Sequence, residues 1–396
     1  YGRILANRTM PGARWFEGAE LNYAENAFRY ASDEYPALVY QSESQSLKEL
    51  SWSDLAAQVA SVAASLRDLG VARGDRVVAY MPNIPETVVA FLAAASLGAI
   101  WSSCSPDFGV EAVLDRFAQI EPTVLFAVDG YSYGGKVFDR LAVVRELQRG
   151  LPSLTRTVLL PLANSSAAGQ LERSMPWSEA AGRSGAELRF EAVPFDHPLW
   201  VLYSSGTTGL PKALVHGHGG VVVEHVKVLG LHNNLRAGDR LFWYTSTGWM
   251  MWNFIVGGLL VGAVPVLYDG SPAYPDLNVL WQLAQDARFT LFGTSAAYIT
   301  GCLKAGITPG RSFDLSSLIC IGSTGSPLPP EGFAWAYKAV KRDLWLASIS
   351  GGTDVVSAFL GGCPLLPVHA GELQCRALGA KVESFDESGH ALVDQM

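Results

Sequence analysis

One stretch of the sequence, residues 76–103, changes its hydrophobic period twice, and this change constrains the fold more than any other feature. Residues 76–80 are predicted to form a strand, 84–97 a helix that follows a Pro-Asn turn, and 99–103 the next strand. A helix between two strands at this spacing is a βαβ crossover, because the helical connection returns the chain to the same end of the sheet. The sequence therefore predicts a parallel sheet covered by helices.

The same alternation continues along the chain. Residues 123–128 and 157–160 are predicted strands on either side of a helix at 137–149, and the Ser-, Ala-, Gly- and Glu-rich residues 162–190 are predicted to form a surface excursion. With 396 residues, of which 49% are hydrophobic, the chain is long enough for more than one core. We therefore expect an α/β fold of stacked, mostly parallel sheets flanked by helices. Further strands are predicted at 38–40, 50–52, 198–202, 239–244, 264–267, 291–293, 318–321 and 344–349, and further helices at 53–69, 219–230 and 252–261.

Charge, hydropathy and cysteine content exclude several classes of protein. The net charge of −8 at pH 7 argues against a nucleic-acid-binding protein. The best candidate for a membrane span, residues 255–268, is interrupted by glycines and a proline and falls short of the roughly 20 residues that such a helix needs. The five cysteines are scattered and form no Cys-x-x-Cys pair, which is typical of a reducing compartment. We therefore expect a cytoplasmic protein with no nucleic-acid partner and no membrane span.

A loop rich in glycine and hydroxyl groups follows the predicted strand at 198–202. Its glycines allow a sharp turn and let backbone N–H groups point toward an anion. The loop lacks the Gly-Lys-Ser/Thr ending of the common P-loop. A turn whose glycines serve geometry alone is the alternative, but the ordered hydroxyls with one lysine favour a polyphosphate site. The predicted phosphate-binding residues are Ser204, Ser205, Gly206, Thr207, Thr208, Gly209 and Lys212.

This loop resembles the phosphate-binding loop of adenylate-forming enzymes, a family that includes acyl-CoA synthetases, luciferases and the adenylation domains of peptide synthetases. The resemblance implies that ATP activates a carboxylate as an acyl-adenylate, with release of pyrophosphate, and that a thiol then accepts the acyl group. AMP turns a carboxylate oxygen, which is a bad leaving group, into a good one. The protein has to align the carboxylate with the α-phosphorus and neutralise the charge that grows on the phosphate oxygens.

The segment 347–354, Ala-Ser-Ile-Ser-Gly-Gly-Thr-Asp, resembles a second nucleotide-binding segment of this family. The resemblance implies that Gly352 and Thr353 contact ATP, with Thr353 at the α-phosphate, and that Asp354, where the family places Glu, coordinates Mg²⁺. Aspartate keeps the oxygen ligands that Mg²⁺ prefers, with a shorter reach. Capping of a helix is the alternative for Asp354. We predict Lys212, Thr353 and Asp354 as the catalytic residues.

The turn at 325–327 follows the predicted strand at 318–321. By resemblance to the family, Gly325, Ser326 and Pro327 contact the adenine of ATP. Many short-chain synthetases carry an acidic residue in place of Ser326, so we expect the contact to come from the backbone. A plain structural turn is the alternative.

The resemblance also places an acyl pocket around residues 249–253. At Gly351 acetyl-CoA synthetases carry a tryptophan, so the glycine implies a deeper pocket, and one methylene in such a pocket is worth about 1–3 kcal/mol. A ketone in the acid would need a donor, since an unpaired buried carbonyl costs about 1–3 kcal/mol. Plain core packing is the alternative for the aromatic and Met residues. The predicted pocket residues are Trp249, Met250, Met251, Asn253, Thr324 and Gly351, with the Trp249 indole, Asn253 and Thr324 as candidate donors.

Three segments, 15–26, 129–136 and 245–253, resemble the acetoacetyl-CoA synthetase branch of the family in particular. This implies that acetoacetate, ATP and CoA are the substrates, that Mg²⁺ is the cofactor, and that acetoacetyl-CoA, AMP and pyrophosphate are the products. Lys136 then contacts CoA, with a solvated surface lysine as the alternative. An acyl-CoA synthetase for another short or medium acid, such as propionate or butyrate, and a non-catalytic nucleotide-binding module are the alternative functions.

The family resemblance also implies a domain organisation. We expect residues 1–396 to be the large N-terminal adenylation domain, with subdomains at roughly 1–195 and 196–370. The small C-terminal domain with its catalytic lysine is expected beyond this chain, so that the chain alone has little activity. The His216-Gly217-His218 sequence is a weak metal signal, and we expect these histidines to pack beside the phosphate loop.

Overall fold

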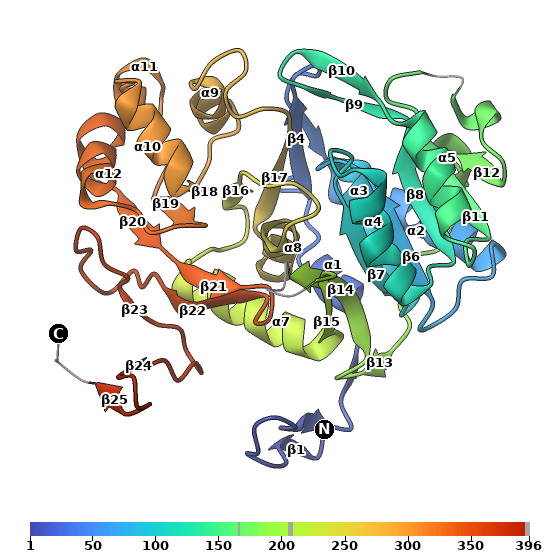
Figure 1. Cartoon of the computed structure of the whole chain (residues 1–396), viewed down its shortest axis with the longest axis horizontal. Coiled ribbons are helices and arrows are strands. Elements are labelled where there is room, and N and C mark those ends of the chain that lie inside the picture. The colour runs from blue at the N-terminus through green and yellow to red at the C-terminus, as the bar shows by residue number, and fades with distance from the viewer. Residues whose placement is uncertain (165–166, 205–208, 393–396) are drawn as a thin grey trace.

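The computed structural model describes residues 1–164, 167–204 and 209–392, and these residues form two seven-stranded sheets (Figure 1). The strand order is β12-β11-β8-β6-β7-β14-β15 in the first sheet and β20-β19-β18-β16-β17-β4-β5 in the second. Neighbouring strands are parallel except in the β14–β15 and β4–β5 pairs, which are antiparallel. Each sheet therefore carries one antiparallel strand at one of its edges.

The strands are those expected of short, buried α/β sheets. The first sheet contains β6 (Arg76–Tyr80), β7 (Ile100–Cys104), β8 (Val124–Val128), β11 (Arg156–Leu160), β12 (Ser174–Pro176), β14 (Pro198–Ser204) and β15 (Lys212–Gly217). The second contains β4 (Leu38–Ser42), β5 (Lys48–Leu50), β16 (Arg240–Trp243), β17 (Val264–Asp269), β18 (Leu291–Ser295), β19 (Cys320–Thr324) and β20 (Trp345–Ser348).

Helices cover both faces of both sheets, and the buried residues form three hydrophobic cores. The central core lies between the sheets and contains α1 (Tyr23–Phe28), α2 (Trp52–Asp68), α3 (Pro85–Ser96), α6 (Trp177–Ala181), α7 (His218–Val226) and α8 (Met250–Val256). The outer face of the first sheet packs on α4 (Val110–Phe117) and α5 (Leu141–Gly150), and that of the second on α9 (Val279–Asp286), α10 (Ala296–Lys304) and α12 (Pro330–Trp335). The predicted α/β class with stacked, mostly parallel sheets flanked by helices is confirmed.

Local sequence explains why these layers form. In β6, Val77 and Ala79 face the central core while Val78 and Tyr80 face the outer one, as the two-residue period of a strand requires. Helix α3 is apolar all round and is buried on all sides between the sheets. Its first residue is Pro85, a position where the missing N–H leaves no hydrogen bond unmade.

The predicted helix at 137–149 is wrong over its first residues. Residues 136–139 form β10 (Lys136–Asp139), which pairs with β9 (Gly130–Tyr133), and α5 begins at Leu141. Gly134 and Gly135 connect the two strands with φ values of +60° and +74°. Two such residues match the twist of a tight hairpin, so the glycine pair decided the local structure here.

The predicted surface excursion at 162–190 is wrong in part. It contributes β12 to the first sheet and α6, whose Trp177 is buried in the central core. A boundary at residue 195 does not separate the two large sheets. The strands β4 and β5 precede it but join the second sheet, whereas β14 and β15 follow it but join the first. The division into subdomains near residue 195 stays a prediction.

The remaining elements are short. They are β1 (Arg3–Leu5), β2 (Trp15–Glu17), β3 (Glu20–Leu21), β13 (Val193–Pro194), β21 (Ser350–Gly352), β22 (Ser357–Gly361), β23 (Cys375–Arg376), β24 (Ser384–Phe385), β25 (Ala391–Leu392), α11 (Pro309–Ser312), the 3₁₀ helices at Ala118–Ile120, Ala167–Gln170 and Gly257–Val261, and the π-helical turns at Lys227–His232 and Ala336–Val340. Among the described residues, no helix is both long and apolar enough to cross a membrane.

Candidate active site

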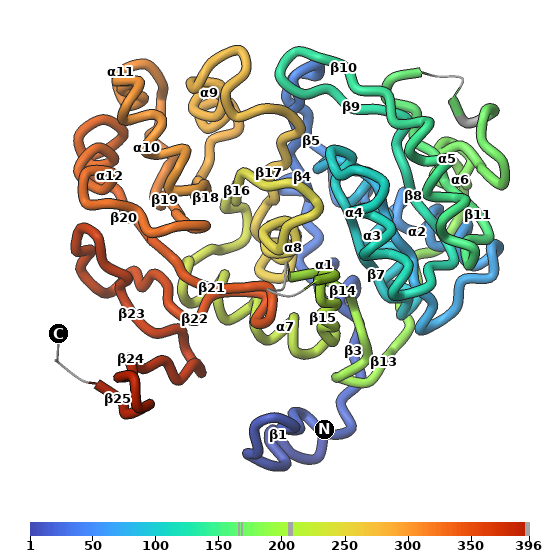
Figure 2. Tube along the Cα trace, in the orientation of Figure 1, coloured from blue at the N-terminus to red at the C-terminus, as the bar shows by residue number. Residues whose placement is uncertain are grey.

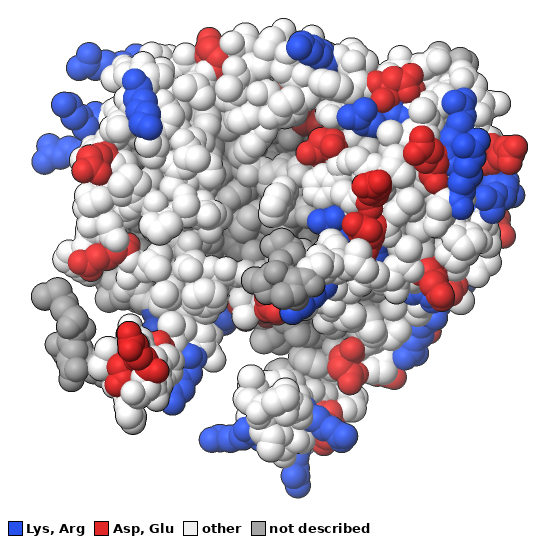
Figure 3. Space-filling view, viewed as in Figure 1, with Lys and Arg blue, Asp and Glu red and all other residues white. Residues whose placement is uncertain are grey.

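A cavity of about 540 Å³ lies where β19 and β20 of the second sheet end. The carboxyl ends of parallel strands meet at one edge of a sheet, which is where ligands bind in open α/β folds. Figure 3 shows that this face of the molecule is hollowed near its middle and that most charged side chains lie toward its rim. The cavity is lined by residues 249–251 and Phe254 of the α8 region, 324–328 after β19, 348–353 after β20, Ser357, and the loop 371–373.

The cavity brings together most of the residues predicted from three separate segments. The predicted adenine turn, the predicted phosphate residues after β20 and five of the six predicted acyl-pocket residues all line it. They are Gly325, Ser326 and Pro327, then Gly352 and Thr353, and finally Trp249, Met250, Met251, Thr324 and Gly351. The roles of these residues stay predictions, but the fold places them around one space large enough for a small ligand.

Of the residues predicted from these three segments, two lie outside the cavity. Asn253 is fully buried within α8 and does not line the cavity, and its side-chain amide has no hydrogen-bond partner in the described part of the chain. Asp354 is exposed and follows Thr353 just outside the cavity. One carboxylate beside the predicted phosphate residues would suit Mg²⁺, which proteins hold with one or two carboxylates and substrate phosphates.

The glycine-rich loop connects β14 to β15 as an antiparallel hairpin. Ser204 pairs with Lys212 where the hairpin closes, and Gly209 has φ +128°, a conformation that side chains disfavour. The predicted residues Ser205, Gly206, Thr207 and Thr208 lie outside the described residues. Both arms of the loop are tied to the region of α4.

Hydrogen bonds connect both arms of the β14–β15 hairpin to the α4 region. The Tyr203 hydroxyl donates to the Arg116 carbonyl at 2.7 Å, and the Gln119 amide donates to the Pro211 carbonyl at 2.9 Å. The described arms on either side of residues 205–208 are therefore both attached to the α4 region.

His216 of β15 links the loop to the turn at 353–354. Burial lowers the pKa of its imidazole, and the Thr353 backbone and the Asp354 carboxylate oppose that change. These interactions show that β15 lies beside the predicted Mg²⁺ and α-phosphate residues. His218 points elsewhere, where its Nδ1 accepts a hydrogen bond from the Tyr23 N–H. Among the described residues, no three His, Cys, Asp or Glu side chains gather as a metal site.

Two hydrogen bonds attach the turn that precedes α8 to the first sheet. The Thr247 hydroxyl donates to the Met81 carbonyl at 2.6 Å, and the Ser103 hydroxyl donates to the Thr247 carbonyl at 2.8 Å. This turn presents Trp249, a residue that is 65% exposed, at the edge of the cavity. The first sheet thus positions a residue of the predicted acyl pocket.

Gly351 lines the cavity with its backbone. A Cβ added there would lie 2.0 Å from the Ser357 carbonyl oxygen and 2.7 Å from the Ala358 Cα, both in β22. A side chain at this position would therefore point into β22 and not into the cavity. From the missing tryptophan we predicted a deeper acyl pocket. In the structure the glycine at position 351 has a different local role, because the missing side chain lets β21 pack closely on β22.

A second chamber of about 760 Å³ adjoins the first cavity and shares Trp249, Met251, Thr324 and Gly325 with it. The two sheets line it together, through residues 105–107, Tyr131 and Tyr133 on one side and 243–246, 268–270 and 294–295 on the other. The predicted CoA residue Lys136 lies on β10, opposite Tyr133 in the hairpin.

Sequence reasoning missed Asp269, which lines this second chamber at the end of β17. Burial raises the pKa of its carboxyl to about 7, and the nearby Glu43 carboxylate adds to the rise. Its carboxyl has no hydrogen-bond partner among the described residues, although the backbone carbonyl bonds to Glu43. The only sequence signal was an acidic residue at the end of a buried apolar run.

Comparison with known proteins supports the family resemblance. A family model described as AMP-binding enzyme matches residues 24–358. Acetoacetyl-coenzyme A synthetase of Rhizobium meliloti (strain 1021) is 49% identical over 383 residues, which cover 96% of this chain and 58% of that protein. Acetoacetyl-CoA synthetase of Mus musculus is 43% identical over 387 residues, 96% of this chain and 57% of that protein.

The solved structure of acetoacetyl-CoA synthetase from Streptomyces lividans superposes with a TM-score of 0.95 at 55% identity. It covers 100% of this chain, which corresponds to 61% of that chain. The chain thus spans less than two thirds of the length of the relatives it matches.

Proposed function

The chain belongs to the family of AMP-binding enzymes, and from this premise we propose that it is the nucleotide- and acid-binding part of an acetoacetate–CoA ligase. The full reaction joins acetoacetate, ATP and CoA to give acetoacetyl-CoA, AMP and pyrophosphate. The names and similarity of the relatives support this substrate choice. The observation that carries the proposal is the single cavity around which the segments 249–251, 324–328 and 348–353 meet.

In the first step an acetoacetate carboxylate oxygen attacks the α-phosphorus of ATP, and the bond from that phosphorus to the pyrophosphate oxygen breaks. The turn 325–327 holds the adenine, while Thr353 and the loop 204–212 hold the phosphates. Lys212 neutralises charge on the phosphate oxygens. Asp354 would hold Mg²⁺, which supplies positive charge to the same oxygens. In the second step the CoA sulfur attacks the acyl carbon, AMP leaves, and the thiol proton is released.

Of the three side chains predicted as hydrogen-bond donors to the ketone, one remains available in the structure. Asn253 lies buried away from the cavity, and the Thr324 hydroxyl already donates to the Ile349 carbonyl at 3.2 Å. The Trp249 indole remains, at the wall shared by the two cavities. We assign it the ketone contact, because an unpaired buried carbonyl would cost about 1–3 kcal/mol.

The acid preference tests this proposal. Acid-dependent release of AMP by the intact protein, with ATP, Mg²⁺ and CoA, should be fastest with acetoacetate when it is compared with acetate, propionate and butyrate at equal concentration. A clear preference for butyrate would keep the ligase chemistry and reject the ketone contact. No AMP with any acid would favour the alternative of a non-catalytic nucleotide-binding module.

Two further predictions belong to the proposal. The chain is the large N-terminal adenylation domain, and the ligase is complete only with a small C-terminal domain that supplies the catalytic lysine. The cytoplasm is its compartment, which the five free cysteines support because such thiols persist under reducing conditions.

A further inference from the structure

One carboxylate, that of Glu43, joins three segments that are distant in the sequence. Glu43 follows β4, and its Oε1 accepts hydrogen bonds from the N–H groups of Gly134 (2.7 Å) and Ser271 (2.7 Å). Its Oε2 accepts a hydrogen bond from the Gly135 N–H (2.8 Å). Hydrogen bonds to an ionised acceptor are roughly twice as strong as neutral ones. Glu43 therefore fastens the β9–β10 turn to the loop that follows β17.

The hairpin needs such a fastening because β9 and β10 pair only with each other in the described chain. Figures 1 and 2 show the hairpin arching from β8 toward β4, from one sheet to the other. At its base, Arg140 donates to the Pro106 carbonyl at 2.7 Å and lies 5.1 Å from the centre of the Tyr131 ring. At its tip, Gly135 packs so closely on Tyr274 that an added Cβ would lie 2.6 Å from the ring.

The fastened hairpin forms a wall of the second chamber. Tyr131 and Tyr133 of β9 line it from one side, and residues 268–270 at the end of β17 line it from the other. Glu43 contacts both sides, since Ser271 directly follows residues 268–270. The distance between hairpin and sheet, and thus the width of the chamber, therefore depends on the Glu43 hydrogen bonds.

We propose that Glu43 is a positioning residue for the thiol substrate, whose arm crosses this chamber to reach the acyl group in the adjoining cavity. Lys136 immediately follows the fastened turn, so Glu43 also sets the place of the one cation predicted to meet the anionic end of CoA. The inference rests on the proposed function for the identity of the thiol. Glu43 itself touches no reacting atom.

The test compares CoA binding with acid activation in the intact protein. Glu43→Gln keeps the shape of the side chain but loses the charge and sets an NH₂ group against a backbone N–H. We expect the Kd for CoA, measured by calorimetry without acid or ATP, to rise about tenfold, because one charge-assisted hydrogen bond is lost. The KM for CoA should rise similarly, whereas acetoacetate-dependent exchange of pyrophosphate into ATP stays within about twofold of wild type.

Two more variants control this experiment. Glu49→Gln makes the same change on β5, where the carboxylate accepts a hydrogen bond from Arg240 at 2.8 Å and not from the β9–β10 turn, and should leave the Kd for CoA unchanged. Gly135→Ala disturbs the tip from the hairpin side, at φ +74° and against Tyr274, and should weaken CoA binding as Glu43→Gln does. Thermal melting checks that each variant is folded.

The outcomes separate the two proposals. An unchanged Kd for CoA in Glu43→Gln, or no CoA binding by the wild type, overturns the role of Glu43. So does a parallel loss of pyrophosphate exchange and CoA binding, which would indicate a general structural role. If Glu43→Gln selectively weakens CoA binding while no acid gives AMP release, the positioning role stands and the acetoacetate proposal fails.

Discussion

Asp269 shows how the fold changes the chemistry of a single side chain. Its carboxyl lies at the end of β17, where desolvation and the Glu43 carboxylate raise its pKa to about 7. Burial also raises the pKa of three nearby tyrosines, Tyr40, Tyr244 and Tyr268, so these three groups stay neutral over the same pH range. Asp269 is therefore about half protonated near neutral pH.

This pKa predicts how stability depends on pH. Between about pH 4 and pH 7 the folded state holds the Asp269 proton while the unfolded chain has lost it, so the free energy of unfolding falls as pH rises through this window. Asp269→Asn, which cannot ionise, should remove that part of the slope in urea unfolding measured from pH 4 to 8. Asp107→Asn, at an exposed carboxyl of the same chamber, should keep the wild-type slope. Equal slopes in Asp269→Asn and wild type would contradict the burial argument.

At the scale of elements, the β21–β22 pair depends on close backbone approach at Gly351. The register shifts by one residue between Ser350 and Gly351, which brings the glycine against the Ser357 carbonyl. The neighbouring Gly352 faces open space. Of these two adjacent glycines in the predicted site, Gly351 is required by close backbone packing, whereas Gly352 has room for a side chain.

Alanine substitution distinguishes these two glycines. In Gly351→Ala the new methyl meets backbone atoms that cannot rotate away, so β21 must move off β22, and we expect a loss of about 1–3 kcal/mol in the free energy of unfolding. Gly352→Ala should change it by less than about 0.5 kcal/mol. Chemical denaturation of both variants measures the difference, and equal stabilities would show that the strands do not pack as described.

Sequence patterns predicted the elements whose hydrophobic period is clear. Strand β6 lies at the predicted residues 76–80, and α3 and β7 differ from the predictions by one residue at their ends. The hairpins β9–β10 and β14–β15 were missed. The pairing of β9 with β10 depends on a turn of two glycines, and β15 adds to the edge of a sheet whose other strands come from elsewhere in the chain. The segments around the first cavity were predictable from motifs, whereas Glu43 and Asp269 belong to no motif and meet only in the folded chain.

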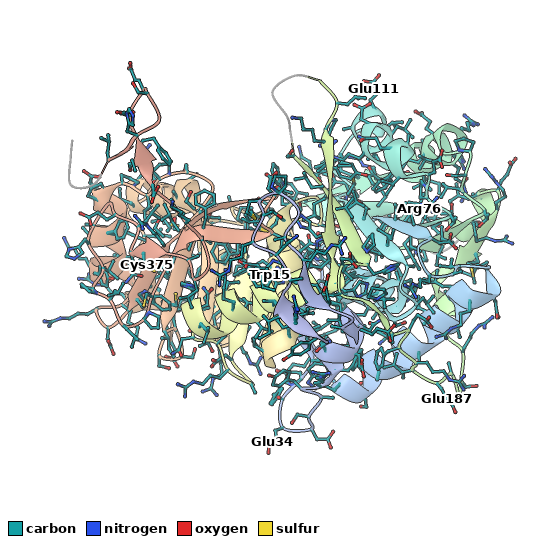
Figure 4. The ribbon with its side chains drawn as sticks, turned by 90° about the horizontal axis from the view of Figure 1, so that it is seen from below. Trp15, Glu34, Arg76, Glu111, Glu187 and Cys375 are labelled. Carbon is teal, nitrogen blue, oxygen red and sulfur yellow. The ribbon has the colours of Figure 1, made fainter. Side chains whose placement is uncertain are left out.

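At the scale of the whole molecule, the two sheets contribute different parts of the proposed site. Seen from below, Arg76 of the first sheet and Cys375 of β23 lie on opposite sides of the molecule, with Trp15 between them (Figure 4). The second sheet contributes the strand ends around the first cavity, and the first sheet contributes the β14–β15 hairpin and one wall of the second chamber. This division fits the proposed two-step reaction, in which the acid is activated in one cavity and the thiol enters through the other.

Isotope exchange between pyrophosphate and ATP tests the central claim most directly, since it reports acyl-adenylate formation without CoA. The proposed site predicts that the intact protein exchanges label only when acetoacetate and Mg²⁺ are both present, with a rate that saturates in acetoacetate. Exchange that is absent, or that proceeds equally well without any acid, would contradict the assignment of the cavity to ATP-dependent activation of acetoacetate.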